Sequence, residues 1–435
     1  MERAAISSAA RRDQVAYRTL KSIFHQRDRV GADAEEQARR DSPAALHWDL
    51  MIGGHSMFAL MTPQVAALIE RIMSFEPTIR AEWEGLPGAA RRHYLDRMVI
   101  DEIQATNEIE HVRSTRREIS EAIEAVRAER PITTRRFAEM VRLYLAIGDD
   151  EAESPQKLDD IRAVYDAVTR GEIRDEDAPD GRRFRQGPVS IESGTKVVHS
   201  GVLPESAIDD ALTLMLSQGR DDSIPRLIRA VVSHFIFEYT HPFYDGNGRT
   251  GRYLLALDLR QVLAPYASLA LSATVADNKD RYYRAFADAE NPLNRGDLTP
   301  YLIDMLEIIA EAQHRLLLDL SERRRKIDTI AARIRLLLED EQFPLSLGLD
   351  RESAPPVDRD DIDAVLYTLG QAHHFDANRT VKLKALADAA KRSSQFIRPR
   401  LQRLDDAGII ETVTKKPLRF GLTARGVSLL ELDGE

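Results

Sequence analysis

The sequence predicts a mainly α-helical protein with one short β hairpin and a separate, smaller C-terminal domain. Apolar residues recur at three- and four-residue spacing between charges over residues 63–80 and 91–127, which is typical of amphipathic helices. Two short extended segments, 184–191 and 195–199, surround a Glu-Ser-Gly turn and indicate a hairpin. Near the C-terminus, two short helical patterns precede a second hairpin pattern and indicate the smaller domain.

The length of 435 residues favours several packed units over a single core. Further helical patterns lie at residues 134–147, 161–168, 224–239 and 253–263. One extended helix or two consecutive helices follow Pro300 and run to about Leu338, and the proline- and acid-rich residues 343–361 indicate a linker. We therefore expect four segments: an N-terminal helical region 1–133, a central core 134–312, a connecting helix and linker 313–355, and a C-terminal domain 356–435.

The composition is that of an ordinary soluble globular protein, with 43% hydrophobic, 30% charged and 6% aromatic residues. No apolar run is long enough to span a bilayer, and no signal peptide is recognisable, so we expect a cytoplasmic protein without a membrane partner. The absence of cysteine excludes disulfides and thiolate chemistry. The net charge of −10 hides an asymmetry, because residues 379–425 hold twelve Lys and Arg against four Asp and Glu.

A twelve-residue segment joins the two predicted helices around residue 245. It runs from His241 to Arg252 and its sequence is His-Pro-Phe-Tyr-Asp-Gly-Asn-Gly-Arg-Thr-Gly-Arg. Gly246, Asn247 and Gly248 tolerate backbone angles that turn successive N–H groups inward. Because a helix begins here, its free N–H groups and its dipole also attract phosphate. The segment therefore predicts an anion cradle.

Charged side chains in this segment complete the prediction. Arg249 and Arg252 supply forked donors one turn apart. Asp245 would be repelled by phosphate unless a cation lay between them, so we interpret it as a Mg²⁺ ligand. His241 is the candidate general base, because an imidazole can accept a proton near neutral pH. Phe243 is expected to point into the core and anchor the loop.

Three other interpretations of these residues are possible, and each fits the sequence less well. His241 and the two arginines could be purely structural, but their occurrence with a carboxylate and a glycine cradle within twelve residues disfavours this. A metal site made of His234, His241 and Asp245 would leave the glycines without a role. The segment is not a Walker loop, because no Lys-Ser/Thr pair follows the glycines.

The segment matches the signature of the Fic family, His-Pro-Phe-x-Asp/Glu-Gly-Asn-Gly-Arg-x-x-Arg, at every defined position. The chain thus resembles Fic (Fido) proteins, whose helical core carries a β-hairpin flap, over roughly residues 106–306. The resemblance implies an enzyme that uses ATP and Mg²⁺ and moves AMP to a protein hydroxyl. By this resemblance His241 is the base and Asp245 holds the metal. The phosphates would contact Gly246, Asn247, Gly248, Arg249, Thr250, Gly251 and Arg252.

Two further segments resemble parts of the same family. The predicted hairpin resembles the flap, which binds a target segment by strand addition. Its residues nearest the nucleotide would be Val189, Ser190, Ile191 and Glu192. Tyr282 and Tyr283 lie on a predicted helix that resembles the wall of the adenine pocket, although two tyrosines on a helix are by themselves more often core residues. The asparagine that usually follows is ambiguous here, because extra residues surround 291–294.

Residues 106–111, Thr-Asn-Glu-Ile-Glu-His, resemble the inhibitory helix of class II Fic proteins. In this interpretation Glu110 pairs with Arg252, so that the arginine cannot hold the γ-phosphate and transfer is suppressed. Thr106 belongs to the same motif. His111 departs from the family, which has Gly or Asn there, and a solvated face of Glu108 and Glu110 is the alternative.

The C-terminal domain resembles a winged helix-turn-helix. Such domains place their second helix in the DNA major groove and a basic wing on the backbone. The candidate DNA contacts are Arg398, Arg400, Arg403, Lys415 and Lys416. Pro399 within the second helix departs from the usual pattern. Protein docking is the alternative role of this domain.

The sequence therefore predicts an adenylyltransferase that acts on a Ser, Thr or Tyr hydroxyl of a protein, the chain itself included. One alternative is a DNA-binding regulator whose nucleotide site is a sensor. Another keeps the enzyme but transfers phosphate or a different nucleotide, or removes AMP. DNA and a second copy of the chain in a homodimer remain candidate partners.

Overall fold

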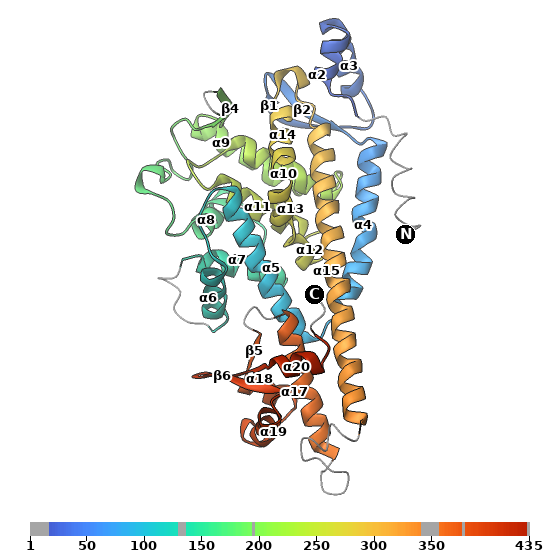
Figure 1. Cartoon of the computed structure of the whole chain (residues 1–435). Coiled ribbons are helices and arrows are strands. Elements are labelled where there is room, and N and C mark those ends of the chain that lie inside the picture. The colour runs from blue at the N-terminus through green and yellow to red at the C-terminus, as the bar shows by residue number, and fades with distance from the viewer. Residues whose placement is uncertain (1–16, 129–135, 194–195, 341–355, 376–378, 433–435) are drawn as a thin grey trace. The chain divides into compact units, whose positions relative to one another are not determined.

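The computed structural model describes residues 17–128, 136–193, 196–340, 356–375 and 379–432 (Figure 1). The chain divides into two compact units, residues 1–77 with 99–315 and residues 78–98 with 316–435. The described residues are mainly α-helical with small two- and three-stranded sheets, which confirms the predicted fold class. The four segments predicted from the sequence divide the chain more finely and remain a proposal.

The first unit contains most of the helices. Its helices, some of which extend into the second unit, are α2 Leu20–Gln26, α3 Arg29–Arg40, α4 Pro63–Glu84, α5 Gly88–Ile109, α6 Arg116–Arg127, α7 Ala138–Gly148, α8 Leu158–Val168, α9 Glu205–Gln218, α10 Arg226–Thr240, α11 Asn247–Leu259, α12 Pro265–Ser268, α13 Leu271–Asp277, α14 Lys279–Ala289 and α15 Thr299–Glu339. Two short 3-10 helices lie at Asp175–Asp177 and Pro292–Asn294. The strands are β1 Ala45–Ile52, β2 His55–Leu60, β3 Ser190–Ser193 and β4 Lys196–Ser200.

Helices α10 and α11 form the centre of the first unit, and α9 packs against α10 (Figure 1). Nearly every side chain of α10 is buried, including Leu227, Val231 and Phe235, because this helix has neighbours on all sides. Helices α7 and α8 contact α11. The turn between α10 and α11 is therefore held on a rigid support.

The sequence predicts a helical N-terminal region. The structure differs, because this region also contains the antiparallel hairpin β1–β2. Its two-residue turn, Gly53 and Gly54, has positive φ at both positions, which suits such a hairpin. Strand β2 also bonds a distant segment: Phe58 N–H donates to Gly296 O at 2.9 Å, and Leu298 N–H donates to Phe58 O at 2.8 Å. The Gly-Gly turn between two extended runs is a local signal for this hairpin, and the sequence-based prediction overlooked it.

The long C-terminal helical pattern is one continuous helix, α15, rather than two. Most of the predicted linker, residues 341–355, lies outside the described residues. Its last part was wrongly assigned, because residues from Pro356 onward begin helix α17. Proline is compatible with the first turn of a helix, where its missing N–H has no partner to lose.

The second unit combines short helices with a three-stranded sheet. Besides parts of α4, α5 and α15, its elements are α17 Pro356–Phe375, β5 Thr380–Lys382, α18 Leu383–Ala389, α19 Ser394–Asp406, β6 Ile410–Lys415, β7 Leu418–Leu422 and α20 Ala424–Leu429. The sheet order is β5-β7-β6, and both pairings are antiparallel. Thus the two predicted short helices and the hairpin are present, while β5, α17 and α20 were not predicted.

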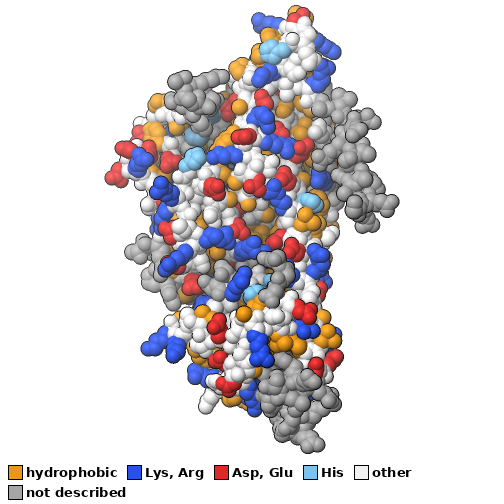
Figure 2. Space-filling model, viewed as in Figure 1, with side chains coloured by type: hydrophobic (Ala, Val, Ile, Leu, Met, Phe, Trp, Pro, Cys, Tyr) orange, Lys and Arg blue, Asp and Glu red, His pale blue; other side chains and the backbone are white. Residues whose placement is uncertain are grey.

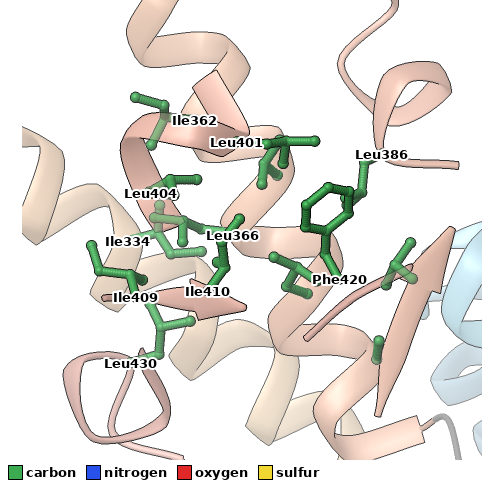
Figure 3. Packing of buried hydrophobic residues seen from close by; sticks show 14 of the residues in the cluster. Ile334, Ile362, Leu366, Leu386, Leu401, Leu404, Ile409, Ile410, Phe420 and Leu430 are labelled. Atoms are coloured by element: carbon green, nitrogen blue, oxygen red, sulfur yellow. The ribbon is translucent and has the colours of Figure 1, made fainter. Parts of the chain in front are cut away.

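One apolar core holds the second unit together. Figure 3 shows Ile334 of α15, Leu366 of α17, Leu404 of α19 and Ile410 of β6 gathered in it, and all four are at most 1% exposed. Pro399 lies inside α19 without ending the helix. The core therefore ties the helix-turn-helix pair to the end of α15.

The surface is charged, and charges of both signs are mixed. Figure 2 shows Lys and Arg side chains interspersed with Asp and Glu side chains over the visible face. Within the described part of the chain, no helix has the length and apolarity that crossing a membrane requires.

The core of the second unit allows a matched test of stability. Ile334 is completely buried, whereas Leu336 on the same helix is 59% exposed. We expect Ile334→Ala to lower the free energy of unfolding by about 2–5 kcal/mol through lost burial and a residual cavity. Leu336→Ala should change it by less than about 0.5 kcal/mol. Urea denaturation of the full chain measures both, and equal effects would contradict this account of the core.

Candidate functional site

The twelve-residue segment forms a tight turn between α10 and α11. Helix α10 ends at Thr240 and is capped by His241, which adopts a left-handed conformation with φ 50° and ψ 61°. Gly246 is left-handed as well, with φ 82°, and α11 begins at the next residue. A Cβ at Gly246 would lie 2.6 Å from the Thr169 methyl group, so both the backbone angle and the close approach require glycine.

Two buried side chains hold this turn in shape. Asn247 accepts a hydrogen bond from Phe243 N–H at 3.0 Å and donates one to Phe243 O at 2.8 Å. The Phe243 ring is fully buried and stacks on the Tyr165 ring with centroids 3.6 Å apart. Phe243 thus lies in the core, where we expected it, while the Asn247 side chain closes the loop.

Arg185, which the sequence analysis did not single out, ties the base of the β3–β4 hairpin to the turn. Its fully buried guanidinium donates to the carbonyls of His241 at 2.7 Å, Gly187 at 2.8 Å and Val202 at 2.9 Å. Burial lowers the pKa of Arg185, but carbonyl acceptors satisfy the charge. One arginine beside an aromatic residue gives no sequence signal for this role, because its partners come from three separate segments.

His241 is set up to accept a proton. Burial, followed by the neighbouring His199, lowers the pKa of His241 to about 4, so the imidazole is neutral at pH 7. Its Nδ1 lies 3.4 Å from Glu238 O. Because a carbonyl can only accept, Nδ1 carries the proton in this contact and Nε2 keeps the lone pair.

The open side of the turn, where Asp245 is exposed and α11 begins, is called its mouth below. It fits an anion together with a divalent cation. The exposed Asp245 accepts a hydrogen bond from Gly246 N–H at 2.6 Å through one carboxylate oxygen only. The first N–H groups of α11 precede its first intrahelical bond, from Thr250 N–H to Gly246 O, and are free to bind phosphate. No group of three or more His, Asp or Glu gathers into a metal cage within the described ranges. A Mg²⁺ ion at Asp245 would therefore need phosphate oxygens and water, which is its usual coordination.

Glu110, at the end of α5, lies over this mouth. Its Oε1 accepts a hydrogen bond from Arg252 Nη2 at 2.8 Å, which is the pairing that we expected. Thr106 accepts two more bonds from the same guanidinium, at Oγ1 from Nε at 2.8 Å and at its carbonyl from Nη2 at 3.1 Å. A Cβ at Gly248 would overlap Glu110 Oε1, so the carboxylate also fills space directly against the cradle.

Glu110 is ionised in this arrangement. Burial by itself would raise the pKa of Glu110, but the Arg252 guanidinium outweighs burial and holds the pKa below its usual value. Burial raises the pKa of the nearby Glu238 to about 8, so this carboxyl is mostly protonated at pH 7. The charge of Arg252 is therefore balanced by Glu110.

The comparisons with known proteins agree with this site. Residues 155–259, which include the whole turn, match the Fic/DOC family model. The chain contains a Fic domain. Such domains typically belong to transferases that use ATP.

Three solved structures are similar at low sequence identity. A Fic family protein from Desulfovibrio desulfuricans G20 is 21% identical, with a TM-score of 0.48 over 84% of this chain and 97% of that chain. A variant of Fic-1 from C. elegans is 18% identical, with a TM-score of 0.42 over 70% and 81%. A Fic-domain signaling protein from Bacteroides thetaiotaomicron VPI-5482 is 14% identical, with a TM-score of 0.39 over 60% and 98%. The family assignment therefore depends on residues 155–259.

Several residues of the Fic motif have structural contacts that the sequence analysis did not foresee. The Thr250 hydroxyl donates to Gly246 O at 2.9 Å and is buried. A Cβ at Gly251 would overlap Glu238, so this glycine permits close packing with α10. Arg249 is 1% exposed and forms an ion pair with Glu172. Among the motif residues, Gly248 and Arg252 are the ones that Glu110 contacts.

The two tyrosines of α14 differ in position. Tyr282 is 2% exposed, and its hydroxyl lies 2.8 Å from His234 Nε2. Tyr282 is thus packed in the core of this structure, and its predicted contact with adenine stays a prediction. Tyr283 is 43% exposed and remains a candidate for that contact. The other ring nitrogen of His234 lies 3.1 Å from Gly251 O, so His234 is not free to bind a metal.

Both asparagines of the inserted segment are occupied. Asn294 is 1% exposed, accepts a hydrogen bond from Lys21 N–H at 2.9 Å and donates to Asp288 O at 2.6 Å. Asn291 accepts a bond from Leu293 N–H at 3.0 Å and caps the 3-10 helix. The insertion therefore joins α14 to the N-terminal region.

The β3–β4 hairpin overlaps the predicted flap, but β3 spans Ser190–Ser193 rather than residues 184–191, so Glu192 and Ser193 lie in the strand and not in the turn. Ile191 pairs with His199 and Glu192 with Val197 in the antiparallel register. Ser190 is exposed and Val189 is partly buried, while the side chains of residues 191–198 lie outside the description. His199, which the sequence analysis missed, is 8% exposed, with its ring 5.6 Å from the His241 ring and its Nδ1 2.7 Å from Glu290.

The candidate DNA-binding residues differ in accessibility. Arg398, Lys415 and Lys416 are exposed. Arg400 lies 3.4 Å from the buried Asp361, and its guanidinium stacks 3.9 Å from the centroid of the Phe396 ring. Arg403 is half-buried. Arg400 therefore helps to hold α19 on α17.

The environment of His241 predicts an unusual titration. We expect its imidazole to titrate near pH 4 rather than near the unperturbed value of about 6.5, because burial disfavours the cation. NMR of ¹³C-histidine-labelled protein between pH 3.5 and 8 measures this. The signal is assigned by its loss in His241→Gln. A midpoint near 6.5 would show that the imidazole is solvated and would contradict the buried environment.

Proposed function

We propose that this Fic-domain enzyme moves AMP from ATP to a Ser, Thr or Tyr hydroxyl of a protein, and that Glu110 inhibits it. One observation carries the proposal: a neutral imidazole, an exposed carboxylate and free helix N–H groups meet within one rigid turn. This set suits an in-line displacement at phosphorus, which requires a base, charge neutralisation and positioning.

His241 acts as the general base in this scheme. Its Nε2 lone pair takes the proton of the attacking hydroxyl, the hydroxyl oxygen bonds to the α-phosphorus, and pyrophosphate leaves. The cradle and Arg252 hold the phosphates by N–H donors. Mg²⁺ held by Asp245 would neutralise phosphate charge. The β3–β4 hairpin would bind the target segment through backbone hydrogen bonds, and Tyr283 would face the adenine.

Inhibition by Glu110 follows from competition for one guanidinium. Arg252 already has a carboxylate and Thr106 as partners, and the carboxylate lies against Gly248. A phosphate at this position would meet a like charge and a filled space. We infer that the segment ending at Glu110 must be displaced before the phosphates are held productively.

The same cradle is compatible with other chemistry. Transfer of phosphate, transfer of a different nucleotide and removal of AMP all need a phosphate site with a base. A nucleotide sensor that carries out no transfer is the alternative from another class. The group that is moved distinguishes these activities.

We expect label on the α-phosphate of ATP, and no label on the γ-phosphate, to enter the protein or a target in the presence of Mg²⁺. Glu110→Gly should raise incorporation about tenfold or more, because it removes a charged hydrogen bond worth about 1.5–3 kcal/mol from Arg252. His241→Ala in that background should lower incorporation by about 10²–10⁴.

Glu108→Gly is the matched control, because Glu108 is exposed on the same helix and the substitution introduces the same glycine. Equal labelling of the Glu110→Gly and wild-type proteins would remove the inhibitory role, and full activity of His241→Ala would remove the base. Entry of the γ-label would indicate phosphate transfer, while entry of neither label would favour the sensor.

A second candidate function concerns the C-terminal residues. We propose that α18 and α19 with the β6–β7 hairpin form a winged helix that binds duplex DNA. The exposed Arg398 on α19, together with Lys415 and Lys416 at the hairpin turn, supports this. Residues 379–425 carry a formal net charge of +8 within an acidic chain, which favours a polyanionic partner.

We expect the full chain to retard duplex DNA, with an affinity that falls as salt rises. Lys415→Ala with Lys416→Ala should weaken binding and lower the slope of log affinity against log salt by about 2. Arg29→Ala with Arg117→Ala removes two exposed charges elsewhere and should have no effect. Absence of binding at low salt would leave protein docking as the role of this domain.

A further inference from the structure

Arg249 is held by a carboxylate from outside the Fic motif. Glu172 pairs with Arg249 through Oε2, and the two side chains are 7% and 1% exposed. Its other oxygen, Oε1, accepts a hydrogen bond from Arg136 at 2.8 Å. Glu172 N–H donates to Thr169 O at 3.0 Å. Both carboxylate oxygens and the backbone of Glu172 are therefore fixed.

The segment that carries Glu172 follows the turn closely. The Tyr165 ring stacks on Phe243, the Thr169 methyl group lies against Gly246, and Glu172 pairs with Arg249. These three contacts recur every three or four residues in both segments, so the last turn of α8 and the residues that follow it form a continuous support for the turn. A change at Glu172 should thus reach the cradle through Arg249.

The two arginines of the motif therefore have carboxylate partners of different kinds. Glu110 is 28% exposed and lies at the end of α5 against Gly248, at the mouth of the cradle. Glu172 is four times less exposed and lies on the supporting segment. A partner at the mouth can be replaced by an incoming phosphate, whereas a buried partner in the support cannot leave without stranding a buried charge.

We propose that Glu172 is a positioning residue that holds Arg249 as a brace beneath the phosphate cradle, which leaves Arg252 as the arginine that binds phosphate. The inference rests on the proposed function, because it assigns the cradle to the phosphates of ATP. It also revises the expectation that both arginines contact the nucleotide. Glu172 acts through Arg249 and the turn and does not touch the substrate.

The affinity for Mg²⁺–ATP shows whether Glu172 supports or opposes phosphate binding. It is measured by isothermal titration of the full chain in the Glu110→Gly background, where Glu110 no longer competes. We expect Glu172→Gln to weaken binding about tenfold, the lower end of the effect of removing a partner that orients a metal ligand. Tighter binding would mean that Glu172 competes with phosphate for Arg249 and would overturn the proposal. Glu176→Gln, at a carboxylate 71% exposed, is the control and should leave the affinity unchanged.

A double-mutant cycle separates positioning from a general loss of stability. If Glu172 acts through Arg249, Glu172→Gln should change the affinity less than about twofold once Arg249→Met is present. An undiminished tenfold effect in that background would overturn the proposal. Should Glu172→Gln fail to fold, Glu172→Asp keeps the charge and should weaken binding about threefold. An unchanged or higher affinity of Glu172→Asp would refute positioning.

The two proposals can fail separately. A parent that binds Mg²⁺–ATP but transfers no label would refute the adenylyltransferase, while its affinity still decides the role of Glu172. A parent that transfers label with an affinity unaffected by Glu172→Gln would refute only the positioning role. A parent that does not bind Mg²⁺–ATP would refute both.

Discussion

The burial of three guanidinium groups around one turn constrains the whole Fic site. Arg185, Arg249 and Arg252 are each at most 1% exposed. A buried charge without a partner costs more than any single contact in the site can return. Each arginine therefore requires acceptors at a defined place, and these acceptors come from the hairpin base and His241, the segment after α8, and the end of α5. The conformation of the turn is therefore fixed by the positions of these hydrogen-bond acceptors.

The three sets of acceptors differ in what can replace them. Arg185 is satisfied by backbone carbonyls, which cannot leave while the fold is intact. The acceptors of Arg252 include a carboxylate at the mouth of the cradle. A phosphate group brings the same sign of charge and the same kind of acceptor oxygen as this carboxylate, so the guanidinium can remain paired during an exchange. The inhibition proposed for Glu110 would therefore be relieved without leaving the charge of Arg252 uncompensated.

The turn and most helices could be predicted from residues close together in the sequence. Features that depend on contacts between distant segments could not. The left-handed Gly246, the start of α11 and the charged side chains all lie within residues 241–252. Their spacing in the sequence was therefore enough to predict them. Glu172 lies 77 residues from Arg249, and no periodicity links the two. Tyr282 and Tyr283 look equivalent in sequence, but neighbouring helical residues point about 100° apart, and only packing against His234 shows which one is buried. The β1–β2 hairpin, in contrast, has a local signal in its Gly-Gly turn and could have been predicted.

The backbone at the end of α5 is strained. Whether Glu110 stays on Arg252 depends on the cost of this strain compared with the free energy of the hydrogen bonds that hold the segment. His111 is left-handed with φ 56°, the position where helices prefer glycine or asparagine, at a cost of about 1–2 kcal/mol. Arg252 makes three hydrogen bonds to Thr106 and Glu110, and Lys279 Nζ donates to Ile109 O at 3.0 Å. Charged hydrogen bonds are worth about 1.5–3 kcal/mol each. These hydrogen bonds thus outweigh the strain at His111, so the strain weakens the contact between Glu110 and Arg252 without breaking it.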